Sequence, residues 1–224
     1  MVCATESGRV HVGACVVGLM AGLIVGPLAD RLATNATTDR PLLTRVPRSR
    51  RLFPVTTATA LLGGACGLAF GLAASSLIAA VFCWILVVVT RTDLEHHLIP
   101  NRIVVPGTVL VLLARTIDDP SVVWLAAALG AGAVLLAIAL IYPAGLGMGD
   151  VKLAAFLGAG LGAGVVVAVF VGFLTAFVPA AALLIRHGRA ARKAAIPLGP
   201  FLALGALVAL FGGDAILDWY LGSD

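Results

Sequence analysis

Long apolar runs constrain this chain more than any other feature of its sequence. Of its 224 residues, 61% are hydrophobic and only 12% are charged, whereas soluble domains carry about 25% charged residues. A helix of about 20 apolar residues crosses a hydrocarbon core of roughly 30 Å. The sequence therefore predicts an all-α, polytopic membrane protein of about eight transmembrane helices, with residues 1–224 forming one membrane-embedded domain. The apolar runs cover residues 10–28, 55–74, 75–92, 102–115, 121–143, 150–162, 163–185 and 198–217.

The first run could instead be a cleaved signal peptide. A signal peptide has positive charges upstream, a shorter apolar region and a small-x-small cleavage site after it. Here Glu6 and Arg9 cancel before the run, and the arginines follow it. We therefore interpret residues 10–28 as a retained helix.

The distribution of basic residues predicts which ends of the helices face the cytoplasm. Cytoplasmic loops of membrane proteins are enriched in Lys and Arg. If the N-terminus is outside, the polar loop 30–54 and the segments after the third, fifth and seventh runs are inside. Only Arg9 and Arg115 of the 15 basic residues then lie outside. We expect both termini to be non-cytoplasmic, in an inner membrane whose anionic lipids meet the basic loops.

The net charge of +4 does not indicate nucleic-acid binding, because the basic residues lie in short loops between apolar runs. Cys3, Cys15, Cys66 and Cys83 are widely spaced. No pair has the Cys-x-x-Cys spacing of a zinc site or a redox dithiol. We interpret these cysteines as small buried hydrophobic residues and expect no cofactor.

Two aspartates stand where an apolar run meets a polar turn. Asp93 follows the third run and Asp150 begins the sixth, and the topology places both on the cytoplasmic side. Singly, Asp150 could be a helix N-cap and Asp93 a solvated interfacial residue. Together they suggest a catalytic pair, because two neighbouring carboxylates share a proton and can act as acid and base on a water. Which one is the base stays open at this point.

The residues around these aspartates have simpler roles. Gly147 and Gly149, without side chains, leave room for an extended substrate near Asp150. Lys152 is turned about 200° from Asp150 on a helix and is expected to reach the headgroups rather than an acidic substrate residue. Glu95, His96 and His97 lack the spacing of metal ligands, so no metal is expected. Pro100 is expected to start the fourth helix.

The chain resembles the type IV prepilin peptidases, a family of membrane aspartic proteases with a Gly-x-Gly-Asp motif. The resemblance covers nearly the whole chain, from Gly22 onward. It is carried by Asp93 with Leu98-Ile99-Pro100-Asn101, by Gly147-Met148-Gly149-Asp150-Val151-Lys152-Leu153 with Gly158, and by the segment 196–205. It implies that Asp93 and Asp150 are catalytic and that Pro100 and Asn101 help shape the site.

The resemblance also implies a substrate and the side of the membrane on which it is cut. Family members cut the short basic leader from prepilins or pseudopilins at the cytoplasmic face of the membrane. Larger members have two Cys-x-x-Cys pairs and an N-methyltransferase activity between the first two helices. The corresponding loop, 30–54, has no cysteine, so we expect a peptidase without zinc or methyl transfer. The oligomeric state is left open.

Two other functions fit part of the pattern. A proton-coupled transporter also uses aspartates within a membrane, but its aspartates would lie near the midplane rather than at helix ends. Another Gly-x-Gly-Asp intramembrane protease, of the presenilin or signal-peptide-peptidase type, would place its first aspartate inside an apolar helix. Here a charged turn follows Asp93.

Overall fold

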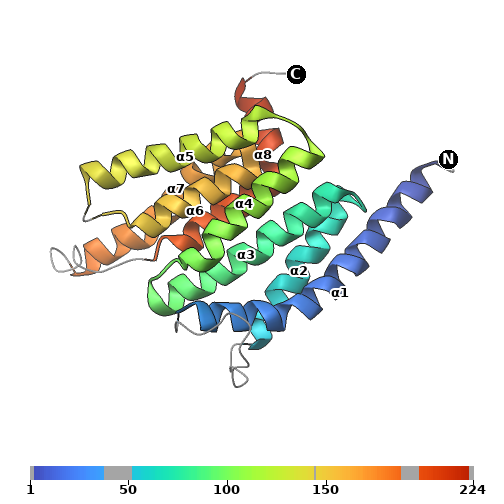
Figure 1. Cartoon of the computed structure of the whole chain (residues 1–224), viewed down its shortest axis with the longest axis horizontal. Coiled ribbons are helices and arrows are strands. Elements are labelled where there is room, and N and C mark those ends of the chain that lie inside the picture. Colours follow the sequence, from blue (N-terminus) through green and yellow to red (C-terminus); the bar gives the residue numbers. More distant parts are fainter. Residues whose placement is uncertain (1–2, 38–51, 144, 188–196, 222–224) are drawn as a thin grey trace.

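The computed structural model describes residues 3–37, 52–143, 145–187 and 197–221, and every regular element within these ranges is helical (Figure 1). The all-α prediction is therefore confirmed, and each predicted run corresponds to one helix. In chain order the helices are α1 (Cys3–Thr37), α2 (Leu52–Phe70), α3 (Ala74–His96), α4 (Asn101–Asp118), α5 (Val122–Ile141), α6 (Met148–Leu161), the 3₁₀ turn η1 (Gly162–Gly164), α7 (Val165–His187) and α8 (Gly199–Leu221).

Length and composition alone select four segments of the described chain as able to cross a membrane. The fourth of them joins α6, η1 and α7 into one stretch, and α2 and α8 contain shorter apolar helices. A membrane protein is therefore supported, while the count of eight crossings stays a prediction. The four segments are His11–Ala36, Ala74–His96, Val122–Ile141 and Met148–Arg186.

The first helix is longer than the sequence predicts. A polar loop was expected over residues 30–54, but α1 continues to Thr37 and α2 begins at Leu52. The predicted start and end of this loop were both wrong, because residues that belong to α1 and α2 were assigned to the loop. Asp30 is instead buried inside the helical bundle, where it pairs with a cation of α3. The remainder of this loop, with most of its arginines, lies outside the described residues.

Glycines allow α1 and α2 to pack with their backbones in contact. Small residues spaced by four line one face of a helix and let helices approach closely in lipid. A side chain added at Gly18 would collide with the main chain of Gly63, and one at Gly22 with that of Thr59. The Thr59 hydroxyl donates to the carbonyl of Gly22 across this interface, at 2.9 Å. These glycines therefore pack α1 against α2.

The centre of the bundle joins α3 to α6. The rings of Phe82 and Phe156 stack with centroids 4.9 Å apart, and both side chains are buried. Gly160 makes room for this pair, because a side chain there would overlap the Phe82 ring. The two helices that carry Asp93 and Asp150 are thus fixed against each other within the core.

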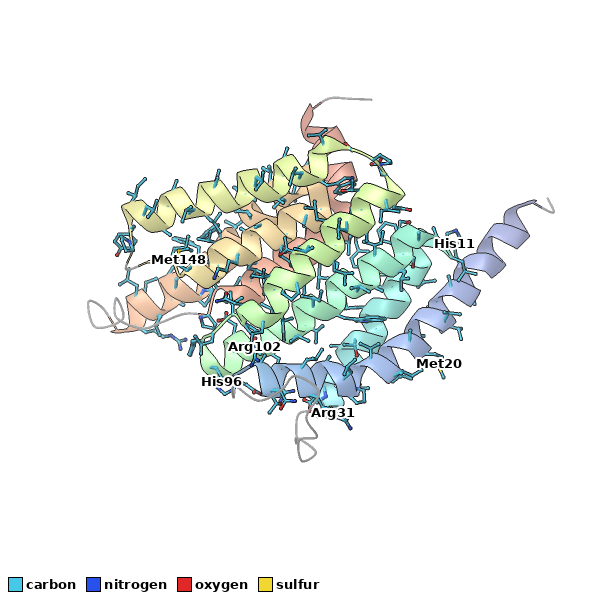
Figure 2. All side chains as sticks on the ribbon, in the orientation of Figure 1. His11, Met20, Arg31, His96, Arg102 and Met148 are labelled. Atoms are coloured by element: carbon cyan, nitrogen blue, oxygen red, sulfur yellow. The ribbon has the colours of Figure 1, made fainter. Side chains whose placement is uncertain are left out.

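The helix ends that matter for the site lie toward one end of the bundle. Figure 2 shows His96 near the end of α3 and Arg102 near the start of α4 toward the same end as Met148, which begins α6. The start of α1 and the end of α8 lie toward the opposite end (Figure 1). This arrangement agrees with the shared side that the charge pattern predicts for the two aspartates.

Candidate active site

Asp93 lies in the last turn of α3, and its residue is only 5% exposed. Its carboxylate Oδ2 accepts a hydrogen bond from the main-chain N–H of Gly199, the first residue of α8, at 2.8 Å. Its own carbonyl accepts the N–H of His97, which ends α3 in a left-handed conformation with φ of 50°. The turn after Asp93 is thus tightly closed, and the carboxylate faces the interior.

Asp150 is the third residue of α6 and is half-buried. Its Oδ2 accepts the main-chain N–H of Gly147, the residue before the helix, at 3.2 Å. A carboxylate near a helix N-terminus also interacts favourably with the helix dipole. The N-cap interpretation was therefore correct about capping but placed Asp150 three residues too early in the helix.

Asp93 and Asp150 belong to helix ends that pack together, because Gly149 beside Asp150 lies against Ile99 in the turn that follows α3. Two helices hold them in this relation, because α4 and α8 each pack against both α3 and α6. Burial and mutual repulsion oppose the state in which both carboxylates are ionised.

The glycines of the motif have different surroundings. A side chain at Gly149 would lie 3.0 Å from Cβ of Ile99, so this glycine allows the start of α6 to pack on the α3–α4 turn. A side chain at Gly147 would lie 3.4 Å from Oδ2 of Asp150, an ordinary contact, and Gly147 is exposed. Of the two, Gly147 is the one placed to leave space beside the carboxylate.

Lys152 and Asn101 contact each other. The Lys152 ammonium donates to Oδ1 of Asn101 at 2.9 Å, which joins α6 to the first residue of α4. The sequence predicted that Lys152 reaches the lipid headgroups, and it did not predict this contact with Asn101. Pro100 directly precedes α4, within one residue of the predicted start.

Sequence reasoning missed a polar cluster next to Asp93, which we call the Arg91 cluster (Asp30, Thr34, Arg91 and Glu95). The Arg91 guanidinium forms an ion pair with the Asp30 carboxylate and donates to the Asp30 carbonyl at 3.0 Å. It also lies 3.4 Å from the Thr34 hydroxyl and 3.4 Å from the Glu95 carboxylate. Asp30 follows the first apolar run and Arg91 lies at the end of the third. These opposite charges at the ends of apolar runs were the signal that could have predicted the pair.

A mainly apolar groove of about 440 Å³ runs between α2, α3 and α8. Arg91, Leu94 and Glu95 line the part of it contributed by the last turns of α3, and Pro200 lies in its wall. Leu94 and Pro200 directly follow Asp93 and Gly199 in the chain. The groove is therefore lined by residues next to Asp93 and Gly199 in the chain, although Asp93 itself does not line it.

Within the described residues, no three His, Cys, Asp or Glu side chains are grouped so that they could hold a metal ion. Glu95, which the sequence placed beside two histidines, contacts Arg91 and lies 3.8 Å from Nε2 of His96. Glu95 thus lies between the buried Arg91 and the exposed His96.

Comparison with known proteins matches residues 80–185 to the model of the type IV leader peptidase family. This segment contains both Asp93 and Asp150. The chain is 38% identical over 168 residues to the prepilin leader peptidase/N-methyltransferase of Bacillus subtilis, covering 73% of this chain and 66% of that protein. The chain belongs to the type IV leader peptidase family.

Other leader peptidases are similar over comparable lengths. The Aeromonas hydrophila protein of the same description is 32% identical over 191 residues, 79% of this chain and 63% of that protein. The Legionella pneumophila protein is 33% identical over 161 residues, 68% of this chain and 56% of that protein. The chain thus spans about two thirds or less of the length of these relatives. No solved structure matches it.

Proposed function

We propose that this chain is a membrane aspartic endopeptidase that cuts the leader peptide from type IV prepilins or pseudopilins at the cytoplasmic face of the inner membrane. The observation that carries the proposal is that the end of α3 with Asp93 and the start of α6 with Asp150 pack together, with Gly149 against Ile99. The names of the relatives, which are prepilin leader peptidases, support the choice of substrate.

In this mechanism the pair holds one proton and a water between its carboxylates. The ionised aspartate takes a proton from the water as the oxygen attacks the carbonyl of the scissile bond. The protonated aspartate donates to the developing oxyanion and so stabilises the tetrahedral intermediate. The protonated aspartate then transfers its proton to the nitrogen of the scissile bond. The carbon–nitrogen bond breaks, and the leader separates from the mature protein.

The depth of the aspartates supports proteolysis over proton-coupled transport. A proton relay in a transporter places carboxylates near the midplane of the bilayer. Asp93 lies in the last turn of its helix and Asp150 in the first turn of its own. A peptide entering from one side of the membrane meets both carboxylates without crossing it.

The groove beside Asp93 supports a substrate that is itself anchored in the membrane. Its walls are mainly apolar along α2 and α8, and its end carries Arg91 and Glu95. An apolar helical stem can lie along such a surface while the polar leader reaches the aspartates. In the family that the sequence resembles, the leader is basic. A basic leader is attracted to the carboxylates of Asp93 and Asp150.

We propose a peptidase activity without methyl transfer. The relatives are named as both peptidases and N-methyltransferases, and the resemblance places the methyltransferase region of larger members between the first two helices. The segment between α1 and α2 contains no cysteine. Zinc-binding Cys-x-x-Cys pairs therefore cannot form there.

The test is cleavage of a purified prepilin in liposomes that contain the protein. Mature product should be seen by gel mobility, and sequencing of its N-terminus should show one cleavage site. Asp93→Asn and Asp150→Asn should each lower the rate at least about 100-fold, since each removes a proton-transferring group. Asp118→Asn is the control, because Asp118 is exposed at the other end of α4.

Either aspartate variant that still cleaves at the rate of the unmodified protein would exclude the paired mechanism. Methylated product formed from S-adenosylmethionine would contradict the absence of methyl transfer. Proton uptake by the liposomes that requires both aspartates, without any cleavage, would favour a transporter instead.

A further inference from the structure

The contact between Gly199 and Asp93 joins residues that are far apart in the sequence. The N–H of Gly199 lies 2.8 Å from Oδ2 of Asp93, and both residues are buried. A hydrogen bond to a charged acceptor is shorter and about twice as strong as one between neutral groups. Because the donor is main chain, it cannot turn away from the carboxylate as a side chain can.

The start of α8 leaves this N–H free to bind a carboxylate. The first four N–H groups of a helix have no acceptor within the helix. In α8 the second residue, Pro200, has no N–H, and the N–H groups of Phe201 and Leu202 both bond to the carbonyl of Leu198, at 3.1 and 3.0 Å. Gly199 supplies the remaining donor, and it is directed at Asp93.

A side chain at position 199 is incompatible with this contact. An added Cβ would lie 2.7 Å from Oδ2 of Asp93 and 3.2 Å from its Cγ. The space that a methyl group would need is thus occupied by the carboxylate itself. Glycine allows the helix terminus to approach the acid to hydrogen-bond distance.

The two aspartates therefore have unequal partners. Asp93 accepts an N–H from another helix in a buried position, at 2.8 Å. Asp150, which is half-buried, accepts the N–H of the exposed Gly147 at the start of its own helix, at 3.2 Å. Burial opposes the ionised form of both acids, and the shorter hydrogen bond to Asp93 offsets this more strongly than the longer bond to Asp150.

We propose that Gly199 is a positioning residue that holds Asp93 as the ionised member of the pair, so that Asp93 is the base and Asp150 carries the proton. This inference rests on the proposed function. One oxygen of Asp93 is fixed by the helix terminus, and the other is left to receive the proton of the water.

The test compares three glycine-to-alanine variants of α8. Gly199→Ala displaces the Asp93 carboxylate from its donor. Gly212→Ala is the matched control, since nothing lies within 4 Å of an added Cβ there. Gly205→Ala reports on packing alone, because its Cβ would collide with the carbonyl of Ala168 in α7.

Gly199→Ala should lower kcat about 10- to 100-fold with KM nearly unchanged, as expected for a lost hydrogen bond to a charge. The acid limb of its pH–rate profile should move to higher pH. Gly205→Ala should reduce the folded fraction but leave the profile of the folded enzyme unmoved, and Gly212→Ala should change neither. A folded Gly199→Ala enzyme with unchanged kcat and profile would overturn the proposal.

A second variant removes the donor without adding atoms. Replacing the amide that precedes Cα of Gly199 by an ester exchanges the N–H for an oxygen without adding a side chain, so it applies even where Gly199→Ala fails to fold. The exchange also weakens the Leu198 carbonyl as an acceptor for Phe201 and Leu202. It should give the same loss of kcat and the same displaced acid limb. An ester variant that cleaves like the unmodified enzyme would equally overturn the proposal.

One readout is independent of cleavage. With ¹³C-labelled aspartate, the infrared carboxylate band of Asp93 is assigned by its loss in Asp93→Asn. The band should shift in Gly199→Ala and in the ester variant but not in Gly212→Ala. If the unmodified protein cleaves no prepilin, the proposed function fails, and this band still decides whether Gly199 binds Asp93 as an ionised group.

Discussion

Arg91 and Asp30 form a buried ion pair that joins α3 to α1 close to Asp93. The side chains of both residues are less than 10% exposed. The guanidinium also donates to the Asp30 carbonyl, at 3.0 Å, so it binds both the side chain and the main chain of α1. Since Arg91 and Asp93 share the last turns of α3, the position of the Asp93 carboxylate depends on the contact between these two helices.

Asp30→Asn should lower the free energy of unfolding by about 3 kcal/mol, because breaking a buried pair leaves a charge without its partner. Glu95, 3.4 Å from Arg91, remains as a second anion. Unfolding in detergent followed by circular dichroism measures the loss. Arg31→Gln is the control, since Arg31 is exposed. Equal stability of Asp30→Asn and the unmodified protein would show that the ion pair contributes nothing.

Gly22→Ala should destabilise the protein by about 1 to 3 kcal/mol, the usual cost of overpacking. Its added methyl group would lie 2.5 Å from Cα of Ala60 and would push α1 away from α2. Gly13→Ala in the same helix meets no atom within 4 Å and should stabilise the helix by up to about 1 kcal/mol. Thermal unfolding measures the change in stability of both variants, which should have opposite signs. Changes of the same sign would refute the proposed packing.

The thiols of Cys66 and Cys83 should resist labelling until the protein unfolds. Their sulfur atoms lie 3.9 Å apart, and both side chains are fully buried. In a Cys3→Ser and Cys15→Ser background, maleimide should modify neither thiol in the folded protein and both in denaturant, as measured by mass spectrometry. Modification of the folded protein at the rate of the denatured one would mean that α2 and α3 separate readily.

Lys152→Met and Asn101→Ala should have similar small effects, each lowering stability by about 1 kcal/mol or less. Both break the same hydrogen bond between α6 and α4, so the double variant should cost little more than either single one. Chemical unfolding of the three variants measures this coupling. If Lys152 instead binds substrate, only its replacement will raise KM for the prepilin.

The sequence was sufficient to predict the helices and to single out two aspartates as candidates, but not to predict their contacts. Apolar runs mark helices because a membrane requires them, and an acid at the end of such a run is conspicuous. Asp93 and Asp150 were found in this way. Gly147 and Asp150 are also close in sequence, so a helix N-terminus near the motif could be expected.

The remaining contacts depend on how distant helices meet. Asp30 was assigned to a loop because its charge suggested solvent, whereas the partner that allows its burial is in α3. Gly199 was noted only as part of a motif, and its bond to Asp93 depends on the approach of α8 to α3. The role of Gly149 likewise follows from the position of Ile99. Helical periodicity contains no information about these pairings.

The turn at Gly162, where φ is +56°, ends α6 after only 14 residues. A helix of that length rises about 21 Å, well short of the roughly 30 Å of a hydrocarbon core. The α6 helix is also largely enclosed by its neighbours, so lipid need not match its length. A helix this short cannot reach both surfaces of a hydrocarbon core, so at least one of its ends would lie below the membrane surface in a bundle that spans it.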